Sequence, residues 1–151
     1  MVKLNRTTEY GLISLSYIRQ KKEGEVTSAR EIADKFALPF EILAKTLQRL
    51  KELGIISASY GTRGGYVLAR DLSRLNLGEF LGLMEGPVSV VACATHSEEK
   101  HACEYSGHCN IKHMMSGLNT RVYEFLNRIS LEELTRSQLN LPEPVLYGEE
   151  P

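Results

Sequence analysis

Three cysteines lie close together in one part of the 151-residue chain, at Cys93, Cys103 and Cys109. Their number is odd and the start of the chain does not look like an export signal, so a framework of disulfides explains them poorly. Thiolates are the usual protein ligands of iron–sulfur clusters and of zinc. The spacing therefore indicates a metal-binding loop, and buried structural cysteines are the alternative interpretation.

A cluster or a zinc ion held by three cysteines needs a fourth ligand. All four histidines of the chain, and several acids, lie in or beside the cysteine segment. These neighbouring candidates are His96, His101, His108, His113, Glu98, Glu99 and Glu104. A single histidine is more often a solvated surface residue than a ligand, so spacing alone does not select one of them.

The elements that must position this loop begin with two helices. Apolar residues recur every three or four positions over residues 8–20, which predicts a first helix. A charged turn follows, and a second helix is expected from Ser28 to about residue 36. Ser28 and Glu31 form a capping-box pattern, in which each side chain satisfies a free backbone amide of the other residue.

A third helix and a hairpin come next along the chain. Pro39 fits the first turn of a helix over residues 39–54. Two short extended runs, 55–60 and 66–69, flank a glycine-rich turn at 61–65, which is typical of a β-hairpin. Three helices followed by a hairpin is the order of a winged helix-turn-helix, so we expect a mainly α fold with one small β-hairpin.

A long amphipathic helix is expected beyond the cysteines. Before the cysteines, Asn76 and Glu79 resemble the capped start of a fourth helix, which closes the first lobe. Apolar residues then recur every three or four positions over residues 111–129, and such a helix needs a partner surface. A second copy of the chain would provide it, and packing against its own first lobe is the alternative. Ser130 and Glu133 begin a last short helix before a polar tail.

The charge of the chain is divided unevenly although its total is only −1. Residues 1–70 carry 12 Lys and Arg against 7 Asp and Glu, whereas residues 71–151 carry 6 against 12. A net +5 joined to a net −6 indicates one lobe that binds a polyanion, with chance patterning as the alternative. No apolar run approaches the roughly 18–20 residues of a membrane span, so we expect a cytoplasmic protein without membrane contact.

The exposed side of the third helix enters the major groove when a winged helix-turn-helix binds DNA. The candidate DNA-reading residues on that side are Lys45, Gln48 and Arg49. An ordinary solvated helix face is the alternative interpretation. Arg63 at the hairpin turn can reach the minor groove or the backbone. Ser28 begins the second helix, whose free amides can bind a phosphate with Arg30 beside them.

Several motifs of the chain belong together in one known family. They are Glu9-Tyr10-Gly11, the run 50–56, the turn 61–66 and the cysteine loop. Over roughly residues 1–138 the chain resembles the Rrf2 family of bacterial winged-helix regulators, and its three cysteines are similar to those of the cluster-binding branch. The resemblance implies a homodimer, crossed through the long helix, that binds double-stranded promoter DNA. It also implies that affinity for DNA changes when an iron–sulfur cluster, with two or four irons, is gained, lost or oxidised.

The chain departs from the family pattern at several positions. Nine residues separate the first two cysteines, where relatives commonly have five. In one branch a histidine follows the last cysteine by three positions, where this chain has Lys112, and His113 comes one later. In another branch an acid of the first helix, supplied by the opposite subunit, completes the site. Glu9 stands at that position and is the implied fourth ligand, with His113 as the alternative. Tyr60 replaces a basic residue that many relatives place before the wing turn.

Together these patterns predict a chain in four parts. They are a DNA-binding winged helix-turn-helix (1–85), a cysteine-bearing cluster-binding loop (86–110), a dimerisation helix with a short terminal helix (111–138) and a flexible tail (139–151). The expected function is transcriptional repression that responds to iron, iron–sulfur status, redox state or nitric oxide. The alternatives are a winged-helix regulator with a zinc site or with a cluster-free thiol switch. An electron carrier or an enzyme fits poorly, because no nucleophile motif accompanies the cysteines.

Overall fold

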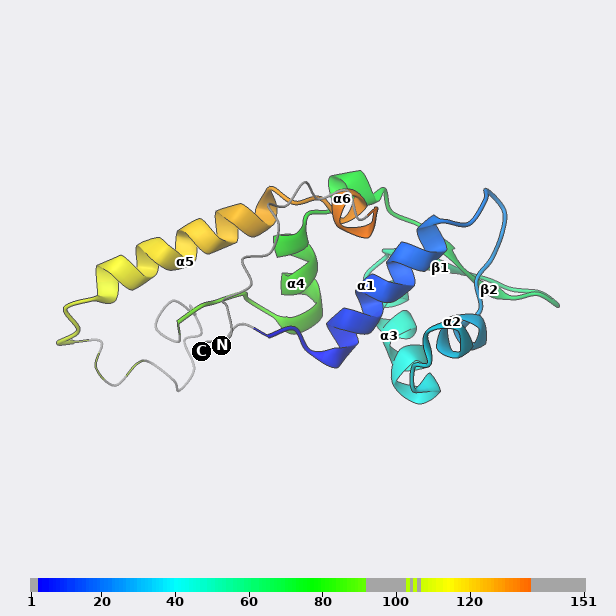
Figure 1. Ribbon diagram of the computed structural model, residues 1–151, viewed down its shortest axis with the longest axis horizontal. Helices are drawn as coiled ribbons and strands as arrows, with labels where there is room; N and C mark the ends of the chain where they lie inside the picture. The colour runs from blue at the N-terminus through cyan, green and yellow to red at the C-terminus, as the bar shows by residue number, and fades with distance from the viewer. Residues whose placement is uncertain (1–2, 92–102, 104, 106, 137–151) are drawn as a thin grey trace, which may run out of the picture.

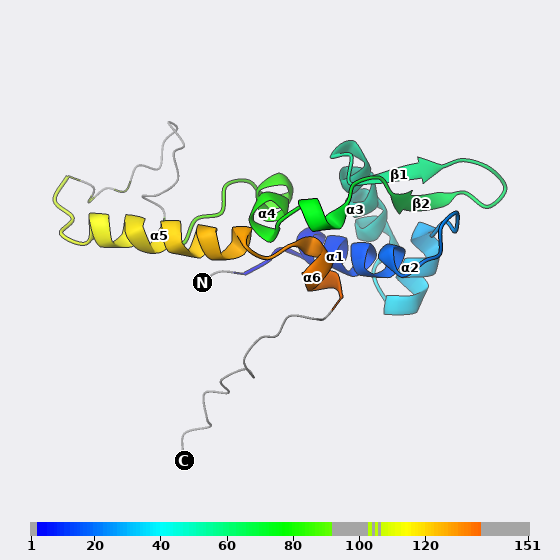
Figure 2. The same ribbon diagram turned by 90° about the horizontal axis from the view of Figure 1, so that it is seen from above.

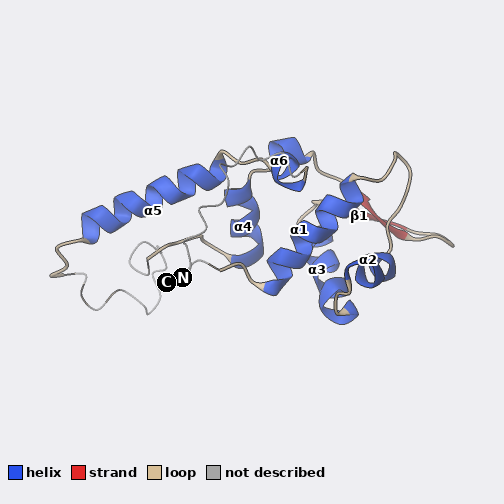
Figure 3. Cartoon of the chain, viewed as in Figure 1, coloured by secondary structure: helices blue, strands red, loops and turns tan. Residues whose placement is uncertain are grey.

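The computed structural model describes residues 3–91, 103, 105 and 107–136. Its elements, in chain order, are α1 (Arg6–Arg19), α2 (Ala29–Phe36), α3 (Phe40–Glu52), β1 (Ile56–Ser59), β2 (Gly65–Leu68), η1 (Leu72–Arg74), α4 (Leu77–Glu85), α5 (Lys112–Asn127) and α6 (Leu131–Thr135). Helices dominate, and the two strands pair into one hairpin (Figure 3). The expected mainly α fold with a small β-hairpin is confirmed. Within the described ranges, no helix has the length and apolar character needed to cross a bilayer.

The molecule consists of a body and an arm (Figures 1 and 2). In the body, α1 packs against α3 and α4, α2 packs against α3, and the hairpin lies at the end opposite α5. The arm is α5, which points away from the body and contacts α4 near its own C-terminal end. After α5 the chain returns to the body, where α6 packs against α1 and η1.

The core of the body is formed by apolar residues of the body helices together with Ile55, Ile56 and Leu75 outside them. Its fully buried side chains are Leu15, Ile32, Leu43, Leu47, Leu50, Ile55, Ile56, Leu75, Phe80 and Leu131. The three leucines of α3 recur every three or four positions, so burying them against α1 fixes which side of α3 faces outward. Gly11 permits the close approach of α1 to α4, because a Cβ there would lie 3.3 Å from the Phe80 ring.

The helix start predicted at Ser28 is confirmed, whereas α1 begins at Arg6, two residues before the predicted start, and is capped by Asn5. The Ser28 hydroxyl caps α2 by accepting a 3.1 Å hydrogen bond from the Glu31 amide. The reciprocal half of the predicted capping box is wrong, because the Glu31 carboxylate instead accepts hydrogen bonds from Tyr17 and Lys21 of the α1 region. Pro39 is also not within the first turn of α3: its backbone is extended, and it forms the N-cap.

The hairpin is anchored to the body by Thr27, which precedes the N-cap residue Ser28 of α2. β1 and β2 pair antiparallel from Ile56 with Leu68 to Ser59 with Gly65. Thr27 adds a further bridge, since its amide and carbonyl bond the carbonyl and amide of Tyr66 at 3.0 and 2.8 Å. These bonds fix the hairpin of β1 and β2, which is the wing, relative to the start of α2.

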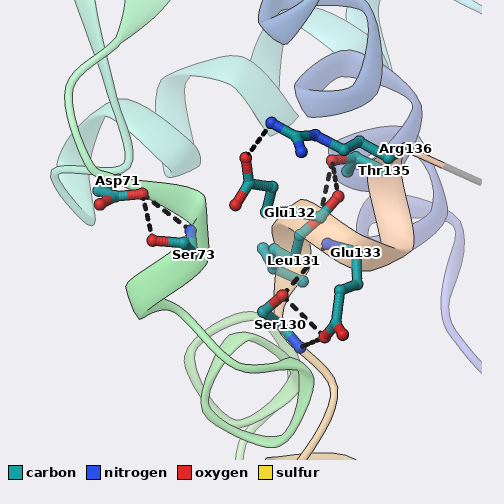
Figure 4. Close-up of polar contacts among 8 residues, drawn as sticks. All are labelled: Asp71, Ser73, Ser130, Leu131, Glu132, Glu133, Thr135 and Arg136. Carbon is teal, nitrogen blue, oxygen red and sulfur yellow. Dashed lines mark hydrogen bonds and ion pairs between the residues drawn. The ribbon is translucent and has the colours of Figure 1, made fainter. Parts of the chain in front are cut away.

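The short helices α6 and η1 are closed by local polar contacts (Figure 4), and the Ser16 hydroxyl of α1 donates a 3.2 Å hydrogen bond to the Thr135 carbonyl of α6. Ser130 and Glu133 form a complete capping box at its start. The Leu131 amide donates a 2.8 Å bond to the Leu75 carbonyl, and the Leu131 side chain is fully buried. Nearby, Asp71 caps η1 by accepting from the Ser73 amide and hydroxyl. Residues far apart in the chain therefore close the same side of the core.

Replacing Gly65 with alanine should destabilise the fold. A Cβ at residue 65 would lie 2.7 Å from the carbonyl carbon and oxygen of Thr27, which is backbone and moves little. We expect the free energy of unfolding to fall by about 1–3 kcal/mol in urea titrations. Gly82→Ala is the matched control, because nothing lies within 4 Å of its Cβ and alanine favours the helix. Equal stability of the two variants would contradict the steric argument.

Candidate nucleic-acid interface and metal site

The outward side of α3 carries the polar residues that the sequence singled out. Leu43, Thr46, Leu47 and Leu50 are buried, and Lys45, Gln48 and Arg49 are exposed. Because 3.6 residues make one turn, burial of the leucines forces these polar side chains into solvent. The structure thus brings them together on one accessible helix surface.

The three polar residues of α3 differ in their hydrogen-bond partners. Gln48 Nε2 lies 3.4 Å from Glu52 Oε1 on the next turn. Arg49 Nη2 donates a 3.1 Å hydrogen bond to the Leu83 carbonyl, which ties α3 to the last turn of α4. Lys45 forms no ion pair or hydrogen bond with any residue that the structure describes.

Ser28 and Arg63 meet at an open groove between the start of α2 and the wing. The groove has a volume of about 850 Å³, and its charged lining residues besides Arg63 are Lys21, Glu25 and Glu31, of which Lys21 and Glu31 pair with each other. It is polar and widely open to solvent. A phosphate-bearing backbone could therefore approach the start of α2 and the wing from the same side.

The wing presents an aromatic side chain that the sequence analysis recorded only as a departure. Tyr60 is 86% exposed, at the end of β1. Lys51 Nζ lies 3.3 Å from its hydroxyl oxygen and donates to it. Lys51 was not among the sequence candidates, although it stands three residues after Gln48 and so occupies the neighbouring turn of α3.

An acid on α2 is held by two donors from the α1 region. The Tyr17 hydroxyl donates to Glu31 Oε1 at 2.6 Å, and Lys21 Nζ lies 2.5 Å from the same oxygen. Lys21 and Lys35 also stand 4.7 and 4.6 Å from the centre of the Tyr17 ring. Hydrogen bonds from Lys21 and Tyr17 hold the pKa of Glu31 below its ordinary value. Glu31 in turn raises the pKa of Lys21, so this lysine stays charged.

Two of the three cysteines lie in the described part of the chain. Cys103 and Cys109 are half-buried and have free thiols, and Cys109 stands just before α5. Cys93 lies outside the described residues, as do His96, His101, Glu98, Glu99 and Glu104. Among the residues that are described, no three His, Cys, Asp or Glu side chains converge as a metal site requires. The thiol donors fit an iron–sulfur cluster or zinc in their chemistry, and the geometry of the full set lies beyond these residues.

The two candidate fourth ligands occupy different parts of the molecule. His113 is exposed in the first turn of α5. Glu9 is in the first turn of α1, where its carboxylate is 38% exposed and pairs with Arg6 at 3.3 Å. The starts of α1 and α5 lie far apart within one protomer (Figures 1 and 2). Of the described cysteines, Cys109 stands four residues before His113 in the chain.

Comparison with known proteins gives consistent matches over most of the chain. The model of the Rrf2 family, described as iron-dependent transcriptional regulator, matches residues 4–137. The chain is 30% identical to the transcriptional regulator IscR of Xenorhabdus nematophila, over 78% of this chain and 68% of that protein. It is 27% identical to the transcriptional repressor NsrR of Streptomyces coelicolor, over 97% and 95%.

A solved structure gives the same fold. CymR, described as the global cysteine regulator of B. subtilis, superposes with a TM-score of 0.69 at 25% identity. The match covers 91% of this chain and 98% of CymR. The agreement between the fold of this chain and that of CymR identifies the body as a winged helix-turn-helix of the kind found in transcriptional regulators.

Replacing Glu31 with glutamine should weaken the contact between α1 and α2 in a pH-dependent way. Near neutral pH we expect a loss of about 0.2–1 kcal/mol in the free energy of unfolding, the range for a partly exposed ion pair. The folded pKa of Glu31 lies below its unfolded value, so its contribution is complete above about pH 4.3 and disappears as the pH falls through the folded pKa. Urea titrations from about pH 7 to about pH 3 should therefore show wild type and variant converging.

Glu23→Gln is the control for this experiment. Glu23 is exposed and makes no hydrogen bond or ion pair with the described residues. The Glu23→Gln substitution should therefore change the free energy of unfolding little at any pH. A Glu31 variant whose deficit stayed constant down to the lowest pH would show that the ion pair contributes nothing.

Proposed function

The chain belongs to the Rrf2 family of transcriptional regulators, and we propose that it is a cytoplasmic repressor that senses iron, redox state or nitric oxide through an iron–sulfur cluster. Its named relatives are regulators of transcription and not enzymes. The observation that carries the proposal is the pair of half-buried cysteines, Cys103 and Cys109, within nine residues before α5, in a chain whose body is a winged helix.

The proposed DNA interface is the outward side of α3 with the wing and the start of α2. Lys45, Gln48 and Arg49 would enter the major groove, while Arg63 reaches the minor groove or backbone. Ser28 and Arg30 would meet a phosphate at the start of α2. The exposure of these side chains, and the lack of an acidic partner for Lys45 in the described structure, support this assignment. Arg49 keeps further N–H donors beside the one used on Leu83.

The proposed cluster ligands are Cys93, Cys103 and Cys109, with Glu9 of the partner subunit or His113 as the fourth. A bound cluster supplies a centre that responds to iron supply, oxidants and nitric oxide. Glu9 can serve in a dimer because its carboxylate is accessible and its ion pair is with Arg6 of its own first turn. An exposed pair of this kind costs little to break.

The last turn of α4 offers a path from the cysteine segment to the DNA-binding helix. Leu83 accepts the Arg49 hydrogen bond from α3, and Glu85 accepts a 2.9 Å bond from the Asn5 amide at the start of α1. The chain then runs on toward the cysteines, and the Val90 amide donates a 2.8 Å bond to Asn119 on α5. Binding of a cluster by the cysteines would fix the segment between α4 and α5. It would therefore shift the population of α4 positions, and with it the orientation of α3.

The long helix supports the proposal of a homodimer. No residue of α5 is fully buried in the protomer. Its large exposed apolar side chains include Met114, Leu118 and Phe125, which are 62%, 43% and 57% exposed. Packing against the chain's own body leaves this face uncovered, and contiguous exposed apolar surface marks an interaction site. A second copy crossing at α5 covers both faces by one symmetric contact.

A cluster-free thiol switch or a zinc site is the second candidate. Cys103 and Cys109 form no disulfide in the described structure, and cysteine thiols can also bind zinc or be oxidised reversibly. The metal content of the protein separates the two candidates.

Protein purified without oxygen should contain iron and sulfide and should absorb visible light. Cys103→Ala should remove most of both, because a cluster loses one of its thiolates. Binding to promoter DNA, measured by fluorescence anisotropy, should change with oxidant or nitric oxide in the wild type and stay constant in the variant. A colourless protein with zinc, or a Cys103 variant that keeps its iron and its response, would overturn the cluster proposal.

Lys45→Ala is the control for this experiment, because it separates sensing from DNA binding. It should keep the iron and sulfide of the wild type and bind DNA more weakly. The slope of log affinity against log salt should become shallower by about 0.9 if Lys45 contacts a phosphate. An unchanged affinity would remove Lys45 from the interface.

A charge placed on the apolar face of α5 should break the dimer. Leu118→Glu puts a carboxylate in the proposed interface, where it would be buried without a partner. Sedimentation equilibrium should show a dimeric wild type and a monomeric variant. Thr120→Glu is the matched control, because Thr120 is exposed and its hydroxyl bonds only the Ser116 carbonyl of the same helix. A monomeric wild type, or equal dissociation of both variants, would contradict the proposal.

A further inference from the structure

An arginine and a phenylalanine stack where the two helices of the helix-turn-helix begin. Arg30 is the second residue of α2, and Phe40 is the first residue of α3. The guanidinium carbon of Arg30 lies 4.2 Å from the centre of the Phe40 ring. Phe40 is 37% exposed and Arg30 is exposed, so the pair lies on the surface and is not a core contact.

The charge of Arg30 is not neutralised within the described structure. The ion pairs there use Arg6, Lys21, Arg70, Arg74 and Arg136. Arg30 takes part in none of them and donates no side-chain hydrogen bond to a described residue. An aromatic ring attracts the cation through its π face, so no oxygen acceptor occupies the guanidinium N–H groups.

This arrangement distinguishes Arg30 from the other basic residues near α3. Arg49 already donates to Leu83, and Lys51 donates to Tyr60. Lys45 makes no ion pair or cation–π contact with a described residue. Arg30 is both held in place and free to donate, which lowers the entropy that binding an anion would cost.

We propose that Phe40 is a positioning residue that holds the Arg30 guanidinium against a backbone phosphate of duplex DNA. This inference rests on the proposed DNA-binding function and adds a residue and a role to it. A guanidinium binds a phosphate through two parallel N–H donors, so its orientation matters more than that of a lysine ammonium. The Phe40 ring, on the first residue of α3, fixes the orientation of the guanidinium. The same contact holds α2 and α3 in one orientation relative to each other when the protein binds DNA.

A double-mutant cycle tests the pair. Duplexes selected from a random pool by the wild-type protein serve as probes, and affinity is measured by anisotropy over a range of salt concentrations. The variants are Arg30→Ala, Arg30→Lys, Phe40→Leu, Phe40→Tyr and the double variant Arg30→Ala with Phe40→Leu.

Phe40→Leu keeps an apolar side chain and loses the ring, so we expect affinity about two- to fivefold weaker, as for an exposed cation–π contact. Phe40→Tyr should restore wild-type affinity. Arg30→Ala should make the slope of log affinity against log salt shallower by about 0.9, and Arg30→Lys should keep the slope but bind more weakly. In the Arg30→Ala background, Phe40→Leu should have no further effect.

Three results would overturn the inference. An equal loss from Phe40→Leu with and without Arg30 would mean that the ring acts through the fold, which urea titration of the same variants would also detect. An unchanged salt slope in Arg30→Ala would mean that the arginine meets no phosphate. Failure of Phe40→Tyr to restore affinity would exclude the ring as the cause. A wild-type protein that binds no duplex would instead refute the proposed function, so the two failures are distinguishable.

Discussion

Burial of the leucine side of α3 is the constraint on which the rest of the molecule depends. Leu43, Leu47 and Leu50 are fully buried, and α1 packs directly over them. Once that side is fixed, helical geometry leaves the polar side no position except the surface. The same packing places the start of α2 and the wing beside α3, since Thr27 bonds Tyr66 of the hairpin. Burial of the leucines thus positions the α3 residues of the proposed DNA interface, and the Thr27–Tyr66 bonds position the wing relative to the start of α2.

Packing also divides the basic residues of the body into two groups with different roles. Lys21 and Lys35 surround the Tyr17 ring, and Lys21 neutralises Glu31, so their charge stabilises the contact between α1 and α2. Arg30 and Lys45 have no acidic partner among the described residues and remain available to an anion. The net charge of the first half therefore overstates what a polyanion meets, and the location of the unpaired charges matters more than their sum.

The last turn of α4 lies between the proposed DNA-binding helix and the segment that leads to the cysteines. Arg49 reaches it from the DNA-binding helix, and the Asn5 amide reaches it from the start of α1. Beyond this turn the chain passes along α5, where Asn119 holds Val90. These polar contacts are separate from the apolar side of α4, where Phe80 and Leu81 are buried in the core. Under the proposed function, a change at the cysteines would reach α3 through these polar contacts.

The sequence by itself determined the helices, the hairpin and the outward side of α3, because periodicity and capping act within a few residues. Tertiary structure decided the partners of the polar groups. The Glu31 carboxylate does not accept the predicted hydrogen bond from the Ser28 amide. It accepts from Lys21 and Tyr17 instead, because packing brings these two residues close and they are stronger donors than a backbone amide. The stacking of Arg30 on Phe40 likewise depends on how α2 meets α3. Such contacts join residues that no local pattern relates, so only the folded chain could select them.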